Sequence, residues 1–337
     1  MRTTTEALRP RASYGYKMTE APRDQPGTGP ILLCAGTDAS AAARLAEVAL
    51  PLLGARAVVV LAKWDPPPVT GGYDAVMDAL YDTHGDLRAV ARNAAAEAAD
   101  AACEVLEPHV PAVTKRVVPD GRGTWQVILD AADDIDAGVI VAGAVERSGE
   151  RPGTLGREAR ALAHRTRRPL LVLRAEAAPA RTSAPALFAF DGSPPAAHAI
   201  DVAARLLAPR PAVVATAWMT AAQSVAVAML AVPDEVARKG AQELDAASRN
   251  EARACADEGA HLLGERGWRC HSAHLQTARK ASTAIIDAAD DRDAALIVTG
   301  TRGRSRVAAT LLGSTAEEIL RHAERPVLLV PPAAQDG

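Results

Sequence analysis

The residues from Gly300 to Thr315, GTRGRSRVAATLLGST, combine glycines and hydroxyl side chains at a spacing that suits phosphate binding. They follow an apolar run from Ala294 to Thr299, typical of a buried strand, and lead into the helical pattern AEEILRHAE. A loop between a strand and a helix presents backbone N–H groups beside the positive end of the helix dipole, where phosphate oxygens bind. This order of elements predicts a phosphate-binding loop.

A simpler interpretation is a tight structural loop, in which Ser314 caps the following helix and Glu317 completes a capping box. That interpretation explains Ser314, but it gives no reason for Gly300 and Gly303. Glycines let a ligand approach the backbone where a Cβ would obstruct it. The residue types therefore favour phosphate binding over a purely structural loop.

The pattern G-x2-G-x9-G-S-T, flanked by LIVTGTRGRS and LLGSTAEEILRHAERPVLLV, resembles the phosphate-binding signature of the universal stress protein family. The resemblance implies an adenine-nucleotide-binding α/β domain of about 140–150 residues, an ordinary size for one domain. It implies ATP, accompanied by Mg²⁺, as the ligand. It also assigns Asp191, Ala217 and Trp218 to the adenine and ribose end. The expected ligand-binding residues are Asp191, Gly192, Ser193, Ala217, Trp218, Gly300, Gly303, Arg304, Gly313, Ser314 and Thr315.

The chemistry of these side chains leaves alternatives open. Asp191 can accept a ribose hydroxyl, or it can form the turn Asp-Gly-Ser-Pro before a helix. Trp218 can lay its indole near a base, or it can be a core or interface aromatic, as Trp64 in the first half suggests. Arg302 and Arg304 can screen the charge of a triphosphate, or they can be solvated surface residues.

Short apolar runs alternate with helical patterns along the chain, which is typical of parallel sheets with crossover helices. The order occurs twice, and residues 127–143 and 284–300 agree at 11 of 17 positions. A repeat this long indicates a duplicated domain, not a solenoid. We expect two tandem doubly wound α/β domains with five-stranded parallel sheets, Rossmann-like and similar to adenine nucleotide alpha hydrolases. Their ligands should lie at the carboxyl ends of the strands.

The expected organisation is a disordered leader over residues 1–29, a degenerate domain over 30–174, a linker over 175–185 and a nucleotide-binding domain over 186–332. The leader lacks the apolar core of a signal peptide, and Met18 is an alternative start. The last strands, Leu170–Leu173 and Val327–Val330, contain no charge that would discourage pairing. We expect them to face each other in an intrachain pseudo-dimer, and a homodimer is also open.

The first half departs from the signature at its loop. Gly143 and Gly156 keep the spacing of Gly300 and Gly313, but Glu146 stands in the place of Gly303. A carboxylate there opposes phosphate by bulk and by charge. Arg157 and Glu158 replace Ser314 and Thr315, while Asp38 and Ser40 are matched with Asp191 and Ser193. We therefore expect one nucleotide per chain, in the second half. The alternative is a different anion held by Arg157.

Composition limits the other functions. The net charge of −3 does not indicate binding to nucleic acid or to an anionic membrane, both of which attract basic proteins. No apolar run is long enough to span a bilayer. The four scattered cysteines indicate reduced thiols, hence a cytoplasmic protein. Walker A and GxSxG motifs are missing from the sequence, so we expect no catalytic residue and no metal site built from protein ligands.

These observations favour a stress-response signalling module gated by its ligand, with at most weak ATP hydrolysis. One rival is a slow ATPase or nucleotidyl-transfer enzyme, with Arg302 and Arg304 on the phosphates and Asp191 on Mg²⁺. Another is a structural scaffold that binds no nucleotide. Steady turnover of ATP by the purified protein would favour the enzyme. Tight retention of nucleotide without turnover would favour the sensor, and the lack of any bound nucleotide would favour the scaffold.

Overall fold

The structure is a computed structural model that describes residues 27–65, 83–120, 124–144, 155–174, 177–220, 234–303 and 312–333. The expected disordered leader over residues 1–29 lies almost wholly outside the described residues. Glu146 and Arg304 lie outside them too. The loop that begins at Gly300 is therefore described only near its two ends.

Each half alternates strands with helices, in agreement with the apolar pattern. The first half contains β1 (Ile31–Ala35), α1 (Ala39–Ala49), β2 (Val58–Trp64), α3 (Thr83–Leu106), β3 (Val113–Pro119), α4 (Thr124–Asp134), β4 (Val139–Gly143), α5 (Arg157–Arg165) and β5 (Leu170–Leu173). The second contains β6 (Ala186–Ala189), α6 (Pro194–Leu206), β7 (Ala212–Met219), α8 (Asp234–Gly264), β8 (Cys270–Thr277), α9 (Ala281–Asp291), β9 (Leu296–Gly300), α10 (Ser314–His322) and β10 (Val327–Val330).

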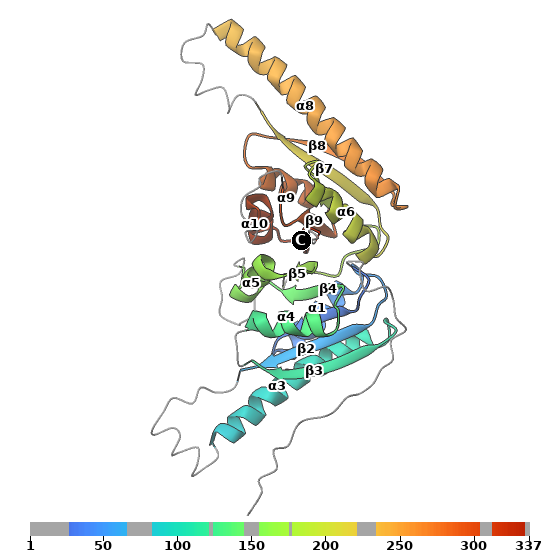
Figure 1. Cartoon of the computed structure of the whole chain (residues 1–337), viewed down its shortest axis with the longest axis vertical. Coiled ribbons are helices and arrows are strands. Elements are labelled where there is room, and N and C mark those ends of the chain that lie inside the picture. The colour runs from blue at the N-terminus through green and yellow to red at the C-terminus, as the bar shows by residue number, and fades with distance from the viewer. Residues whose placement is uncertain are drawn as a thin grey trace, which may run out of the picture.

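The strands form one sheet in the order β3-β2-β1-β4-β5-β10-β9-β6-β7-β8. Pairing is parallel within each half, and helices cover both faces (Figure 1). Counted outwards from the middle of the sheet, the first half has the order β5-β4-β1-β2-β3 and the second half the equivalent order β10-β9-β6-β7-β8. The two tandem doubly wound five-stranded domains predicted from the sequence are thus confirmed.

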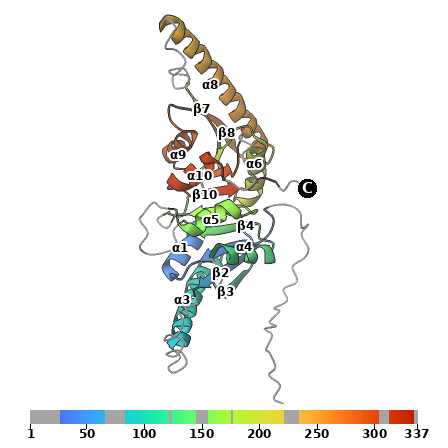
Figure 2. The ribbon, with the colours of Figure 1, turned by 60° about the vertical axis from the view of Figure 1, so that its left-hand side comes forward.

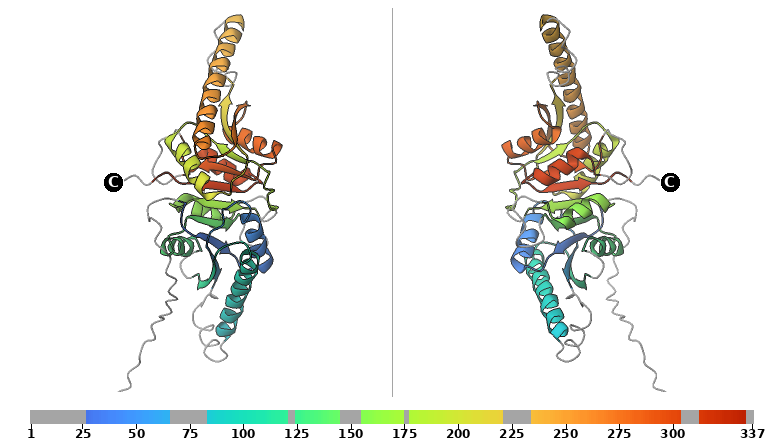
Figure 3. Two further views of the ribbon diagram at one scale, coloured as in Figure 1. Left: turned by 90° about the vertical axis from the view of Figure 1, so that its right-hand side faces the viewer. Right: turned by 90° about the vertical axis from the view of Figure 1, so that its left-hand side faces the viewer.

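The central strands are buried on both faces, which explains their continuous apolar runs. Successive side chains alternate between two cores, so Leu33 packs into one and Leu32 into the other. The long helices α3 and α8 extend away from the sheet at opposite ends of the molecule (Figure 3). None of the described helices is both long and apolar enough to cross a membrane.

The two halves meet along β5 and β10, which lie side by side near the middle of the molecule (Figure 2). This pairing is antiparallel, with Leu171 directly opposite Leu328, and both side chains are fully buried. A second contact joins the loops before β2 and β7 through an antiparallel bridge between Leu53 and Leu207. In both contacts a residue meets its own counterpart from the other half, as expected around an approximate two-fold axis.

Two arginines strengthen the second contact in the same reciprocal manner. Arg56 donates from Nη2 to the carbonyl oxygen of Arg205 at 2.6 Å, and Arg210 donates from Nη2 to the carbonyl oxygen of Pro51. Burial lowers the pKa of both guanidinium groups, although each keeps its charge at neutral pH. The seam between the halves therefore combines a strand pair with a pair of crossed arginines.

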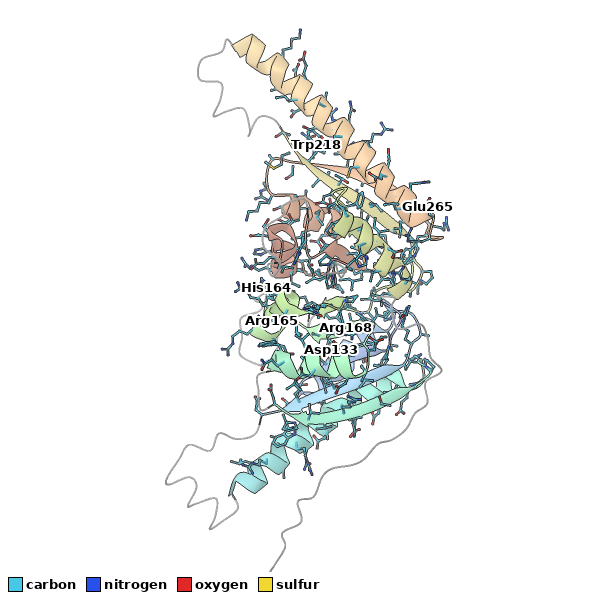
Figure 4. The ribbon with its side chains drawn as sticks, in the orientation of Figure 1. Asp133, His164, Arg165, Arg168, Trp218 and Glu265 are labelled. Carbon is cyan, nitrogen blue, oxygen red and sulfur yellow. The ribbon has the colours of Figure 1, made fainter. Side chains whose placement is uncertain are left out.

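A second duplicated feature lies near the amino ends of β4 and β9. Arg168 Nε contacts Asp133 Oδ1 at 3.1 Å, and Arg325 Nε contacts Asp290 Oδ1 at 3.1 Å. Figure 4 shows Arg168 and Asp133 next to each other in the first half. Such solvent-exposed ion pairs contribute little stability individually, but their repetition shows how closely the two halves correspond.

Candidate functional site

A cavity of about 290 Å³ lies at the carboxyl edge of the second half's sheet, where β6, β7 and β9 end. The strand order changes direction between β6 and β9, and ligands of open α/β sheets bind at such switch points. Most of the residues predicted to bind a ligand line this cavity: Asp191, Ala217, Gly300, Gly303, Gly313, Ser314 and Thr315. The structure thus brings together residues from four separate parts of the second half.

The N-terminal turns of α6, α9 and α10 open onto the same cavity, through Ala196, Ala281 and Ser314 respectively. The N-cap residues of α9 and α10, Lys280 and Gly313, make no side-chain capping hydrogen bond. The first N–H groups of a helix have no partner within the helix, and its N-terminus carries a partial positive charge. The cavity is therefore lined by helix ends whose partial positive charge favours an anion.

Ser314 does not cap α10, so the simpler structural interpretation of the loop is wrong on this point. The helix begins at Ser314, and its cap is Gly313, which has no side chain to accept a hydrogen bond. The Gly313 N–H donates to the carbonyl oxygen of Thr301 at 2.7 Å, and Glu317 pairs with Arg321 at 2.8 Å instead of closing a capping box. The hydroxyls of the first turn are left exposed beside the cavity.

The glycines of the loop have a reason inside the protein, which the sequence argument missed. A Cβ at Gly303 would lie 2.7 Å from Asp191 Oδ2, and a Cβ at Gly300 would lie 3.2 Å from the carbonyl oxygen of Pro195. A Cβ at position 303 would therefore push the Asp191 carboxylate aside, so a glycine suits this position whether or not a ligand binds. The contact also places the Asp191 carboxylate directly against the loop.

Asp191 forms the turn that the sequence suggested as an alternative. Its Oδ1 accepts the N–H of Ser193 at 3.0 Å, and Gly192 has a positive φ of 77°. The Ser193 hydroxyl in turn accepts the N–H of Ala196 at 3.3 Å and caps α6. One carboxylate oxygen therefore shapes the turn, while the other lies beside Gly303 at the cavity.

Trp218 does not line the cavity, although the sequence analysis placed its indole near a base. Side chains alternate along a strand, so Ala217 faces the cavity and Trp218 faces α8. Its ring is 6% exposed, and the Arg249 guanidinium lies 5.6 Å from its centre, as the position beside α8 in Figure 4 indicates. The alternative of a packed aromatic describes this side chain.

Several contacts fix the walls of the cavity. Thr301 donates its N–H to the carbonyl oxygen of Val330 at 2.9 Å, which ties the start of the loop to β10. Lys280 Nζ lies 2.9 Å from Glu318 Oε1 and joins α9 to α10. The hydrogen bond from Lys280 lowers the pKa of the Glu318 carboxyl, so this pair is charged at neutral pH. The two helices that present their N-termini are thereby held together.

The first half has no carboxylate at the position that corresponds to Asp191. Asp38 caps α1 as Ser193 caps α6, and the register of β1 with β4 agrees with that of β6 with β9. Asp38 is therefore the counterpart of Ser193, and Gly36 is the counterpart of Asp191. The sequence match of Asp38 with Asp191, and of Ser40 with Ser193, was wrong by two residues.

An ion pair stands in the first half where the second half has its cavity wall. Lys63 and Glu158 occupy the positions of Ala217 and Thr315. Their side chains, 9% and 8% exposed, form a salt bridge at the N-terminus of α5. The sequence analysis did not single out Lys63. Aligning the ends of β2 and β7 would have found it, because Trp64 and Trp218 mark the same position.

We expect Lys63→Ala to destabilise the protein by about 3 kcal/mol, because it leaves the Glu158 carboxylate buried without its cation. Lys63→Ala combined with Glu158→Thr, which copies the second half, should recover most of that loss. Urea unfolding measures both. The exposed pair of Lys115 and Asp100 is the control, since Lys115→Ala should cost less than about 1 kcal/mol. A double variant as unstable as Lys63→Ala would contradict the pairing.

Other reactive groups form no second centre in the described part of the chain. Those residues contain no group of three or more His, Cys, Asp or Glu side chains that could hold a metal ion. The four cysteines form no disulfide: Cys34, Cys103 and Cys255 are buried, and Cys270 is half-buried. Burial raises the pKa of the Cys103 and Cys270 thiols, which disfavours the reactive thiolate.

Comparisons with known proteins agree with this architecture. The model of the universal stress protein family matches residues 28–174 and 184–331. A comparison with curated proteins gave no match. Among solved structures, a universal stress protein from Archaeoglobus fulgidus DSM 4304 is 16% identical, with 90% of this chain and 96% of that chain covered and a TM-score of 0.51.

Two further structures are similar. A candidate universal stress protein from Pseudomonas aeruginosa UCBPP-PA14 is 19% identical, with 91% of this chain and 95% of that chain covered and a TM-score of 0.51. The universal stress protein from Archaeoglobus fulgidus in complex with dAMP is 21% identical, with 44% of this chain and 98% of that chain covered and a TM-score of 0.31. The two structures that cover most of this chain show the shared fold, and the family matches cover both halves. The chain therefore belongs to the universal stress protein family.

Proposed function

We propose that the second half binds an adenine nucleotide, ATP with Mg²⁺, in the cavity at the ends of β6, β7 and β9. The observation that carries this proposal is the first turn of α10, which begins at Ser314 after the cap Gly313, has no side-chain capping hydrogen bond and lines the same cavity as Asp191. Anions bind at such helix ends, and a carboxylate in the same cavity suits a sugar hydroxyl.

In this proposal the phosphates lie against the start of α10. Ser314 and Thr315 donate their backbone N–H groups and hydroxyls, and Arg302 contributes positive charge from the cavity wall. Arg304 belongs to the same proposed site, although it lies outside the described residues. The helix dipole and the N–H groups supply the attraction, so the site needs no lysine of the Walker type.

The sugar and base occupy the opposite part of the cavity. The Asp191 carboxylate accepts a ribose hydroxyl, and the small side chain of Ala217 leaves room for the flat face of adenine. Gly192 and Ser193 act indirectly, because they form the turn that holds Asp191 in place. Trp218 supports the end of β7 from the other face and makes no contact with the nucleotide.

Mg²⁺ enters with the nucleotide in this account. This ion keeps several water ligands and is commonly bound by phosphate oxygens with one or two carboxylates. Asp191 is the acidic side chain that lines the cavity in the described part of the chain. One of its oxygens accepts the Ser193 N–H, and the other faces the loop at Gly303, where it can meet a ribose hydroxyl or the ion.

We propose signalling, not turnover, as the output. Bound phosphates would fix the loop from Gly300 to Gly313 against α10 and thereby change a surface that a partner can recognise. None of the described residues in the cavity is a histidine, glutamate or lysine that could activate a water molecule. A slow ATPase remains the competing function, since Arg302 and Asp191 both line the cavity.

Calorimetric titration with ATP and Mg²⁺ tests the proposal. We expect one nucleotide per chain, because the first half has Gly36 in place of Asp191 and the Lys63–Glu158 pair in place of the cavity wall. The domain limits 30–174 and 186–332 are part of the same proposal. Titration to two equivalent sites would contradict it, and steady release of phosphate from ATP would favour the enzyme.

A further inference from the structure

A second cavity, of about 350 Å³, lies in the first half at the amino edge of the sheet. It lies between the start of β1 and β2 and the C-terminal ends of α1 and α3, and it is half open to solvent. Its walls are mainly apolar: Ile31, Leu33, Leu53, Val58, Leu106 and Val110. It lies in the other half, and at the other edge of the sheet, from the proposed nucleotide site.

The same place in the second half is filled by an aromatic ring of the protein itself. The Trp268 indole is 9% exposed and packs edge-on against Phe188, with ring centres 5.8 Å apart and planes at 83°. Its Nε1–H points to the carbonyl oxygen of Ala204 at 3.4 Å. The indole thus has both an apolar surface to cover and a polar group to contact.

The counterparts of these residues follow from the duplicated elements. Leu33 and Phe188 are the third residues of β1 and β6, which have equivalent registers. Pro111 and Trp268 each stand two residues before β3 and β8, and Pro111 is exposed. Ala49, the counterpart of Ala204, lines the cavity as Leu33 does. The first half therefore lacks both rings at a place where the second half packs them.

Other substitutions between the halves offset only part of this loss. Ile31 and Val58 are larger than their counterparts Ala186 and Ala212, yet the cavity remains. Protein interiors are otherwise packed to nearly constant density, with few voids larger than a water molecule. A half-open cavity of this size at the place of the Trp268 ring is therefore a specific feature of the first half.

We propose that this cavity binds a small, planar, apolar molecule of about the size of indole. Apolar pockets accept such molecules, because filling them restores van der Waals contacts and removes apolar surface from water. This ligand class follows from the second half, where the Trp268 indole occupies the same place. That ring packs against the central strand β6, and its N–H points to the carbonyl oxygen of Ala204 in α6. The site is independent of the proposed nucleotide site.

NMR titration with indole tests this site. Indole should shift the methyl resonances of Leu33, Leu53 and Leu106 and saturate at one molecule per chain. Pro111→Trp copies the second half and should fill the cavity, weakening indole binding by at least about tenfold. Glu107→Trp places the same ring on the exposed turn beside it and should leave the binding unchanged.

Leu33→Phe is a second variant that should fill the cavity and weaken indole binding. It replaces Pro111→Trp in the test if circular dichroism shows that Pro111→Trp does not fold. The proposal is overturned if the parent protein shows no methyl shifts with indole. It is also overturned if a folded filling variant binds indole as tightly as the Glu107→Trp control. A parallel titration with ATP and Mg²⁺ should give the same result in every variant, because the nucleotide site is distant.

Discussion

Gly303→Glu is expected to lower the affinity for ATP with Mg²⁺ by at least about 100-fold, or roughly 2.7 kcal/mol. A Cβ at this position would lie 2.7 Å from Asp191 Oδ2, so the new side chain must displace that carboxylate or shift the loop. Its negative charge would also stand beside the proposed phosphate position and repel the nucleotide. Calorimetric titration measures the loss.

Gly264→Glu is the matched control. It makes the same substitution at the end of α8, where nothing lies within 4 Å of the added Cβ. Its nucleotide affinity should equal that of the parent, and both variants should keep the parent's circular dichroism spectrum, because the loop lies at the surface. If Gly303→Glu binds nucleotide as the control does, the loop is not part of the ligand site.

Leu171→Asp combined with Leu328→Asp is expected to separate the two halves. These leucines lie directly opposite each other in the β5–β10 pair and are fully buried. Two carboxylates at this point repel each other and lose their water, at a cost of several kcal/mol. What then remains of the seam is the bridge between Leu53 and Leu207 with the hydrogen bonds of Arg56 and Arg210. Small-angle scattering should show a larger radius of gyration.

The control for this pair is Thr114→Asp with His271→Asp, on the exposed edge strands β3 and β8. These positions are also counterparts of each other, so the control adds the same two charges without touching the seam. Far-UV circular dichroism should show that each half stays folded in both variants. An unchanged radius of gyration in the Leu171→Asp and Leu328→Asp variant would refute the pseudo-dimer.

The period of the apolar residues made the fold predictable. Runs such as Ile31–Ala35 are buried on both faces of the sheet, and the repeat of residues 127–143 at 284–300 revealed the duplication. Strand order then follows from the rules for parallel sheets with crossover helices. These are properties of long segments, which tolerate an error of one or two residues.

The site demands an accuracy of one residue, and there the sequence analysis made errors. Trp218 follows Ala217 in the chain but points to the opposite face, because side chains of a strand alternate. The cap of α10 is Gly313 and not the hydroxyl of Ser314 one position later. Asp38 was matched with the wrong residue, because the loops after β1 and β6 differ in sequence.

Contacts between distant segments could not be predicted at all from one sequence. The approach of Gly303 to Asp191, and the pair of Lys63 and Glu158, each join residues about a hundred positions apart. Both involve the segment that runs from the fourth strand of a half into the first turn of the next helix. The difference between the halves is therefore concentrated where the ligand is proposed to bind.

The most direct test of the account is mass spectrometry of the ligand released when freshly purified protein is denatured, with the amount measured per chain. The account predicts an adenine nucleotide, at no more than one molecule per chain, and its loss in Gly303→Glu but not in Gly264→Glu. Release of two nucleotides per chain, or the absence of any adenine nucleotide from protein that also fails to bind added ATP with Mg²⁺, would contradict it.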